Sequence, residues 1–275
     1  MEIIPMTGAL GAEVLGADLR NENDAAAIVK AFTDYGVLAI RGQNISPEDH
    51  IAFAGRFGKI NINRFFTPVA SHPQIAEVRK EADQKEAIGE IWHTDHSYDA
   101  VPAMGSILHA IDMPDVGGDT MFASMSTAYD ALSEPIKHLV SGLTAQHDTM
   151  HVFLLSKAAK EARAASRLGE MKEAPPNAQH PMVIRHPFSG RKCLYVNPQF
   201  TTGIIGLSDI ESAGILNMLY DHCANPDFQC RVRWRKGDVT MWDNRSTWHK
   251  AVNDYQGKRR YMHRITVEGV ALVAG

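Results

Sequence analysis

The pattern of apolar and polar positions predicts helices and strands in alternation, with strands predominating towards the carboxyl end of the chain. Amphipathic runs bounded by capping residues, proline or glycine predict helices over 25–35, 46–58, 126–140 and 208–222. Apolar runs and strictly alternating runs predict strands over 37–40, 106–111, 228–235, 239–242 and 260–267. The sequence has no internal repeat and no heptad array, so it does not predict a solenoid or a coiled coil.

The strand-rich carboxyl half, with helices before and between its strands, indicates the fold class. In 228–235 apolar and basic residues alternate, which is typical of a strand with one buried face and one solvated face. We therefore expect a mainly β protein, with an antiparallel double sheet of the jelly-roll kind decorated by α-helices. A chain of 275 residues can form one such unit with insertions, so we expect a single domain over 1–275.

The stretch 156–180 differs in composition from the rest of the chain. It is rich in alanine and charged residues, contains the pair Pro175-Pro176 and carries little apolar material. This composition predicts an exposed helix followed by a mobile loop. We interpret 156–180 as a lid insertion beside a functional site.

Composition and charge exclude several classes of protein. A hydrophobic fraction of 44% and a charged fraction of 22% are typical of a globular chain. The net charge of -4 at pH 7 does not indicate the basic surface that binds nucleic acid or an anionic membrane. The amino terminus lacks the basic start and apolar run of a signal peptide, so we expect a cytoplasmic protein. The cysteines Cys193, Cys223 and Cys230 lack CxxC spacing and are predicted to be small buried residues.

The segment WHTDHSYD at 92–99 contains the first candidate metal ligands. In a strand, His93 and Asp95 would face the same side, and His249 offers a third ligand from a distant segment. Two imidazoles and one carboxylate leave three positions of a divalent ion open, as in the facial triad of non-haem iron(II) oxygenases. The spacing alone leaves two alternatives open. One is a polar turn without metal, and the other is a zinc or manganese hydrolase, although the chain has no HExxH motif.

Two arginines on the last predicted strand strengthen the case for a site. Arg260 and Arg264 are four residues apart and would point to the same, inward face. Burying two guanidinium groups costs free energy unless anions meet them, and small carboxylate ligands would do so through bidentate contacts. The alternative is that one or both arginines pair with Asp or Glu at the rim of the barrel.

Several motifs together resemble one family of enzymes. The motifs lie in the order and spacing of the taurine and 2,4-D dioxygenase family, which depends on iron(II) and 2-oxoglutarate. They are WHTD (92–95), PxxGGDT (114–120), WDNRxTxH (242–249) and RRxMHRxT (259–266), with GAEVLGADL (11–19) and RFG (56–58) near the amino end. The resemblance therefore covers nearly the whole chain.

The resemblance implies a fold, two cofactors and a set of catalytic residues. The implied fold is a double-stranded β-helix, which is a jelly-roll, cupin-like core. His93, Asp95 and His249 would bind iron(II). The implied reaction uses 2-oxoglutarate and O2, releases succinate and CO2, and hydroxylates a small anionic organic substrate, with C–O or C–S cleavage following in some cases.

The resemblance also implies how the anionic groups are held. Thr120 and Arg260 would bind the distal carboxylate of 2-oxoglutarate, and Arg264 would face the acidic group of the primary substrate. The segments HPxxxxHPxSGRKxLYVN (180–197) and CRVRW (230–234) are similar to those of members that act on aryloxyalkanoates. An aryloxyalkanoate or a sulfonate is therefore the expected type of substrate.

Six further residues are candidates for the substrate pocket. Asn63 and Phe65 lie where taurine-like members carry a histidine-rich stretch, which argues against taurine itself. Tyr98 and Phe153 could line an apolar pocket with Phe65 and Phe66, although each of these aromatic residues taken alone fits the core better. His96 would point away from the site in a regular strand and would reach the substrate only if the chain bends.

Two other functional classes stay open at this point. A metal-dependent hydrolase would use the same three ligands without 2-oxoglutarate, and a non-catalytic sensor would bind 2-oxoglutarate or an acid without forming succinate. Members of the family are often oligomeric, so we also expect a homo-oligomer.

Overall fold

A computed structural model of the chain describes residues 1–155, 157–165, 167–169 and 176–275. In these ranges the fold is mainly β with helices around it, as predicted, and the strands form four sheets. No helix in the described part of the chain combines the length and the apolar character that a membrane crossing requires.

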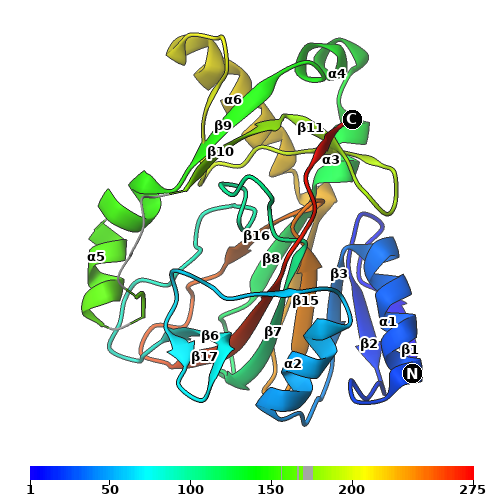
Figure 1. Cartoon of the computed structure of the whole chain (residues 1–275), viewed down its shortest axis with the longest axis vertical. Coiled ribbons are helices and arrows are strands. Elements are labelled where there is room, and N and C mark those ends of the chain that lie inside the picture. Colours follow the sequence, from blue (N-terminus) through cyan, green and yellow to red (C-terminus); the bar gives the residue numbers. More distant parts are fainter. Residues whose placement is uncertain (156, 166, 170–175) are drawn as a thin grey trace.

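The largest sheet has nine strands and runs through the lower part of Figure 1. β2 and β3 pair in parallel, whereas the other pairs in this sheet are antiparallel. The order is β1 (Glu2–Pro5), β2 (Ala12–Leu15), β3 (Val37–Ile40), β15 (Val239–Asp243), β7 (Gly105–Asp112), β17 (Arg260–Val267), β6 (His72–Lys80) and β5 (Pro68–Val69), with β4 (Ile60–Asn61) also paired to β17.

A three-stranded sheet packs against one face of the large sheet. It consists of β14 (Gln229–Val232), β8 (Thr120–Ser124) and β16 (Thr247–Ala251). A single apolar cluster joins Leu108 and Met262 of the large sheet to Phe122 and Val232 of the small one. The space between these two sheets is therefore filled by side chains from both.

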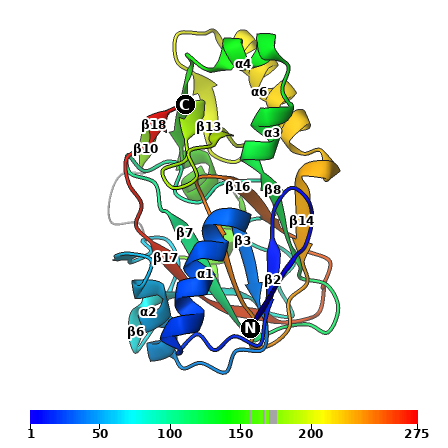
Figure 2. The same ribbon diagram turned by 90° about the vertical axis from the view of Figure 1, so that its right-hand side faces the viewer.

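Helices α1 (Glu22–Tyr35) and α2 (Pro47–Gly55) cover the other face of the large sheet (Figure 2). Ile28 of α1 and Phe53 of α2 are fully buried in the same apolar cluster as Ile107 of β7. Burying such side chains contributes about 1.5–3 kcal/mol each, which holds both helices on the sheet.

A second group of helices and short strands lies above the two sheets in Figure 1. Trp248 of β16 is fully buried in the apolar cluster of this group, and its Nε1 donates to the carbonyl of Val196 at 2.7 Å. The group therefore fixes β16 from its outer side. Its elements are α3 (Met125–Ala131), α4 (Glu134–Val140), β9 (Thr144–Asp148), β10 (Asn177–Pro181), β11 (Val183–Arg185), β12 (Lys192–Leu194), β13 (Thr201–Ile204), α6 (Asp209–Cys223), the 3₁₀ turn η2 (Pro226–Phe228) and β18 (Val273–Ala274).

Several predicted boundaries differ from the observed ones for local reasons. α1 begins at Glu22 because the side chain of Asn21 caps it, which extends the helix beyond its amphipathic run. The predicted helix 126–140 is two helices, since Pro135 occupies the first turn of a new one. The alternating strand 228–235 is regular only over 229–232.

The proposed lid segment, 156–180, lies only partly within the described residues. Residues 156, 166 and 170–175 are outside them. The described part contains α5 (Lys157–Ala164), which follows the π-helical turn η1 (Met150–Leu155). Ala159 and Ala162 of α5 are buried beside Phe153, and 177–180 form part of β10, which pairs with β9. The lid interpretation stays a prediction.

We expect the metal-free protein to lose stability in acid because of buried histidines. Burial and the neighbouring His109 lower the pKa of His50 to about 3, and burial together with His180 lowers that of His147 to about 3. Below pH 6.5 the unfolded chain therefore binds protons that the folded chain does not, and the free energy of unfolding falls as pH falls. The expected loss at pH 5 is about 2 kcal/mol for each histidine.

Urea unfolding at pH 7.5 and pH 5.0 measures this loss. His50 and His147 together contribute one part of the loss of unfolding free energy between the two pH values, and His50→Leu should remove about half of that part. An exposed control, His138→Leu, should leave the loss unchanged. An unchanged pH dependence in His50→Leu would show that His50 takes up a proton in the folded state.

Candidate active site

Two histidines from distant parts of the sequence meet at the centre of the site. His93 and His249 exchange two backbone hydrogen bonds, of 3.0 and 2.8 Å, in an isolated antiparallel bridge at the start of the WHTD segment. Their rings lie 4.0 Å apart, centroid to centroid. The neighbouring chain then turns, so Asp95 lies in a turn and not in a strand. The predicted strand over His93 and Asp95 is therefore wrong, although both side chains do face one point.

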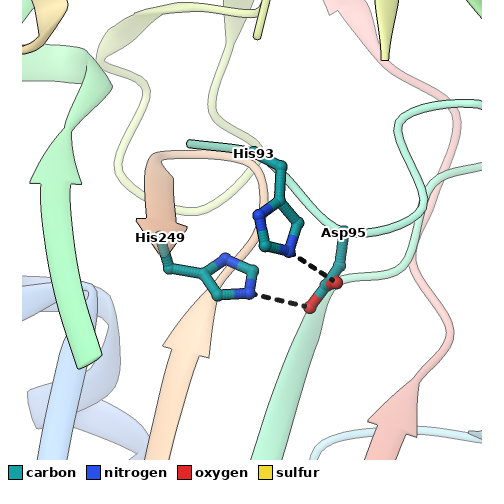
Figure 3. A group of neighbouring side chains, drawn as sticks. All are labelled: His93, Asp95 and His249. Atoms are coloured by element: carbon teal, nitrogen blue, oxygen red, sulfur yellow. Dashed lines mark ion pairs between the residues drawn. The ribbon is translucent and has the colours of Figure 1, made fainter. Parts of the chain in front are cut away.

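The three side chains place their ligand atoms around a common centre (Figure 3). Nε2 of His93 lies 3.7 Å from Oδ1 of Asp95, and Nε2 of His249 lies 3.6 Å from Oδ2. These separations are too long for direct hydrogen bonds. They suit atoms that share an ion, because two ligand atoms about 2.1 Å from one ion lie roughly 3 to 4 Å apart. The three residues form the one such cluster of His, Cys, Asp or Glu found among the described residues.

Protonation states also fit a metal site. Nδ1 of His93 lies 2.8 Å from the carbonyl of Ile91, to which it donates, so Nε2 keeps its lone pair for a ligand bond. Burial lowers the pKa of both His93 and His249, which keeps both imidazoles neutral. Burial raises the pKa of Asp95, but the charge of the Arg264 guanidinium is the largest opposing influence, and this pKa lies well below its usual range. Two neutral imidazoles and one carboxylate are the donor set that non-haem iron(II) takes.

Arg264 and Ser106 hold the carboxylate of Asp95. A guanidinium nitrogen of Arg264 lies 2.7 Å from Oδ2 of Asp95 and donates to Oγ of Ser106 at 3.0 Å. Ser106 in turn donates to the same Oδ2 at 3.0 Å. The alternative that an arginine pairs with an acidic residue is thus realised for Arg264, but at the centre of the site. Ser106 carried no signal in the sequence, because a serine at the start of an apolar strand is ordinary.

Arg260 and Thr120 form a second group of polar side chains between the two sheets. Nε of Arg260 donates to the carbonyl of Gly118 at 3.0 Å, and its Nη2 lies 3.4 Å from Oγ1 of Thr120. Nε1 of Trp234 donates to the same Oγ1 at 2.9 Å. No carboxylate forms an ion pair with Arg260 within the part of the chain that the structure describes. This buried guanidinium therefore has capacity for an anion.

The turn that leads into β16 explains most of the WDNRxTxH motif. Arg245 makes two hydrogen bonds, of 2.8 and 2.5 Å, to the carboxylate of Asp243, and Oγ1 of Thr247 donates to the Asp243 carbonyl at 2.7 Å. Nε2 of His186 lies 3.0 Å from the same carboxylate. These buried contacts set the conformation of the turn and thereby the position of His249.

A cavity of about 70 Å³ adjoins the three ligand residues. All of the predicted site residues line it except Phe65: they are Asn63, His93, Asp95, His96, Tyr98, Thr120, Phe153, His249, Arg260 and Arg264. Phe65 lies behind the wall, where its ring stacks on that of Phe153 at 4.1 Å, whereas the neighbouring Phe66, which was also a candidate, does line the cavity. Phe200 and Gln199 also line the cavity and were not predicted.

His96 reaches the cavity because the chain bends. Its φ of 57° lies in the left-handed region, which a regular strand does not contain. Nδ1 of His96 lies 2.9 Å from Oδ2 of Asp99, which also pairs with Arg64 at 2.9 Å. Nε2 is buried and has no hydrogen-bond partner among the described residues. The bend brings a polar atom to the cavity that a straight strand would turn away from it.

Comparison with known proteins agrees with this arrangement. The family model described as taurine catabolism dioxygenase TauD, TfdA family matches residues 2–266. The chain belongs to this family. The resemblance drawn from the four motifs is thereby confirmed, and so are its cofactors, iron(II) and 2-oxoglutarate. This TauD/TfdA protein is a 2-oxoglutarate-dependent dioxygenase.

Similar proteins and structures span almost the whole chain. An alkylsulfatase of Acinetobacter baylyi is 34% identical, over 98% of this chain and 85% of its own length. The (S)-phenoxypropionate/alpha-ketoglutarate-dioxygenase of Sphingobium herbicidovorans is 32% identical, over 98% of this chain and 95% of its own length. The crystal structure of a taurine dioxygenase from Burkholderia xenovorans has a TM-score of 0.83 and 29% identity, covering 99% of this chain and 92% of that one. AAD-2 in complex with Mn(II) and N-oxalylglycine has a TM-score of 0.77 and 28% identity, covering 98% and 97%.

Proposed function

We propose that this dioxygenase hydroxylates a small anionic organic substrate, with His93, Asp95 and His249 as its iron ligands. The single observation that carries the proposal is that three ligand atoms converge in a cavity that two buried arginines, Arg260 and Arg264, also line. When bound, iron(II) supplies the oxidation chemistry that couples loss of CO2 from 2-oxoglutarate to oxidation of a C–H bond. One oxygen atom of O2 enters succinate and the other enters the hydroxylated product.

The two arginines are proposed to divide the anions between them. Arg260, which has no acidic partner among the described residues, and Thr120 hold the distal carboxylate of 2-oxoglutarate. Arg264 faces the acidic group of the primary substrate, while its bond to Asp95 orients that ligand. His96 adds a hydrogen bond to the substrate through Nε2, and Asn63 offers its side-chain amide. The protein thus supplies position and charge, and iron supplies the reaction.

The substrate class rests on the charge and the lining of the cavity. A cationic head site at Arg264 lies beside aromatic walls formed by Tyr98, Phe153 and Phe66. Such a site suits an anion with an apolar body, such as a sulfonate, a sulfate ester or an aryloxyalkanoate. Three similar proteins are named as dioxygenases of a sulfonate, of a sulfate ester and of 2,4-dichlorophenoxyacetate, which is an aryloxyalkanoate. Hydroxylation next to the ether or ester oxygen, or next to sulfur, would then lead to C–O or C–S cleavage.

Three further features belong to the proposal. The two packed sheets are proposed to form a double-stranded β-helix, since similar structures are those of taurine dioxygenases. The homo-oligomer and the cytoplasmic location stay predictions.

An anaerobic titration tests the proposed function. Iron(II) and 2-oxoglutarate are added to the metal-free protein, and the visible charge-transfer band of 2-oxoglutarate chelated to iron is recorded. Candidate anions are then added to see which of them shift the band. Iron-loaded, folded protein without the band would contradict the dioxygenase function and favour a metal-dependent hydrolase. A band without succinate formation in air, with every candidate anion, would favour a sensor.

We expect Phe153→Ala to widen the range of accepted substrates. Phe153 separates the central cavity from a neighbouring apolar cavity of about 400 Å³ under α5, and its side chain lines both. Removing the ring should let a longer apolar tail enter the second cavity, which should lower the KM for long-chain substrates several-fold and weaken binding of short ones. A series of alkyl sulfates of increasing chain length measures the change.

Ile210→Ala is the control for this series, since Ile210 of α6 is 87% exposed and lines neither cavity. An unaltered dependence on chain length in Phe153→Ala would show that the two cavities do not join when the ring is absent.

A further inference from the structure

Lys80, the last residue of β6, is a buried cation to which the proposed reaction assigns no role. Its side chain is 2% exposed, and its Nζ has no hydrogen-bond partner among the described residues. The one contact recorded for the ammonium is the ring of Tyr255, whose centroid lies 4.5 Å from Nζ. A buried ammonium without a paired anion costs several kcal/mol, so an ordinary core position would not retain it.

The register of the sheet places Lys80 beside Arg260. The two residues are direct partners in the antiparallel pair of β6 and β17. Directly paired residues project to the same face, with Cβ atoms about 4.5 to 5.5 Å apart. Two like charges in this position destabilise a sheet unless an anion lies between them. Both residues are buried, so water screens their repulsion little.

The protein itself offers little negative charge to this pair. Glu90 acts on Lys80, but it is exposed and its Oε1 accepts hydrogen bonds from Ala87 and Asn253. Asp119 acts on Arg260, but its Oδ2 is already paired with Arg231 at 2.6 Å. Arg167, a further buried cation, also acts on Lys80 and opposes its charge. The surroundings of Lys80 are therefore electropositive in the described part of the chain.

The space around Lys80 connects it with the co-substrate site. Lys80, Tyr255 and Arg260 line a void of about 10 Å³, which has room for a water molecule at most. The two spaces adjoin, because both are lined by Arg260, Val78, Ile88 and Ala251. An anion bound to Arg260 from the central cavity would lie on the side to which Lys80 projects.

We propose that Lys80 is a second cationic residue for the distal carboxylate of 2-oxoglutarate, acting beside Arg260. This inference rests on the proposed function, because it takes the anion at Arg260 to be that carboxylate. The bound carboxylate would supply the charge that both residues lack and would set the preference of the site for a dicarboxylic oxo acid over a monocarboxylic one.

Calorimetric titration of two oxo acids into the manganese-loaded protein tests the inference without turnover. 2-Oxoglutarate carries the distal carboxylate, whereas 2-oxopentanoate has the same chelating end and the same chain length without it. Lys80→Met should weaken 2-oxoglutarate about tenfold and change the affinity for 2-oxopentanoate by less than about twofold. Lys85→Met, at an exposed lysine in the loop that follows β6, should alter neither affinity.

The Tm of the ligand-free protein distinguishes an anion-binding lysine from a purely structural one. Removing an uncompensated buried cation should leave the Tm of the ligand-free protein unchanged or raise it, whereas removing a structural lysine should lower it. Lys80→Leu serves as the second variant if the methionine variant does not fold.

Three results would overturn the inference. Equal loss of affinity for both oxo acids would show that Lys80 supports the fold of the site, and unaltered affinity for both would show that its charge does not reach the carboxylate. Wild-type protein that binds manganese but not 2-oxoglutarate would overturn the proposed function as well, and this outcome is distinct because it appears before any variant is made.

Discussion

His93→Ala and Asp95→Ala should each abolish iron binding and turnover. The three ligand atoms lie within 4.8 Å of one another, so losing any one leaves two donors, too few to hold the ion against water. The affinity for iron should fall by more than the roughly 10- to 100-fold that the loss of an outer partner of a ligand costs. Metal content after loading and gel filtration, together with succinate formation, measures both effects.

The two variants should differ in stability, which separates ligand loss from unfolding. Asp95→Ala leaves the buried Arg264 without its carboxylate and should lower the free energy of unfolding of the metal-free protein by about 3–5 kcal/mol. His93→Ala removes no charge partner and should cost less. His138→Ala, at an exposed histidine of α4, is the control. Iron-dependent turnover that persists in His93→Ala would show that another residue supplies the ligand.

Arg260→Gln and Arg264→Gln should affect the two organic substrates in opposite ways. Arg260→Gln should raise the KM for 2-oxoglutarate by about 100-fold and leave that of the primary substrate within about threefold, because truncating one partner of a buried charge pair costs about 2–5 kcal/mol. Arg264→Gln should raise the KM for the primary substrate by a similar factor. Initial rates with each substrate varied in turn measure the division.

The contact between Arg264 and Asp95 adds a second effect to the Arg264 variant. Without the guanidinium, the pKa of Asp95 should rise towards its ordinary value, and iron binding should weaken as pH falls. Arg260→Gln should bind iron as the wild type does. If both variants raise both KM values equally, the two arginines act as one electrostatic unit and the proposed division is wrong.

The sequence predicted the elements that have a clear hydrophobic periodicity or a helix-capping motif. The strand 260–267 is observed with the same bounds, and α6 follows the predicted capping box of Ser208 and Glu211. The ends of other elements were not predictable in the same way. Gly55 ends α2 before the expected Gly58, where no capping residue in the sequence marks the end.

The site was predictable where chemistry restricts the residue type and not where geometry alone places it. Histidine, aspartate and arginine in fixed motifs pointed to His93, Asp95, His249 and Arg260, which the fold brings together. Ser106 was missed because serine is common in strands, and its role depends on a cross-strand position that no local pattern encodes. Phe65 and Phe66 were both candidates for the pocket, and the sequence did not distinguish them because the bend of their loop decides which ring lines the cavity.

The backbone bridge between His93 and His249 has a consequence for the time at which the enzyme acquires iron. Two of the three ligands are fixed against each other by hydrogen bonds that exist only once β16 has joined the fold. On the ribosome, the chain emerges from its amino end, so His93 and Asp95 leave the exit tunnel well before His249, which lies 249 − 95 = 154 residues after Asp95. Nascent chains that have not yet exposed His249 therefore present no complete iron site, and metal capture follows the pairing of His249 with His93.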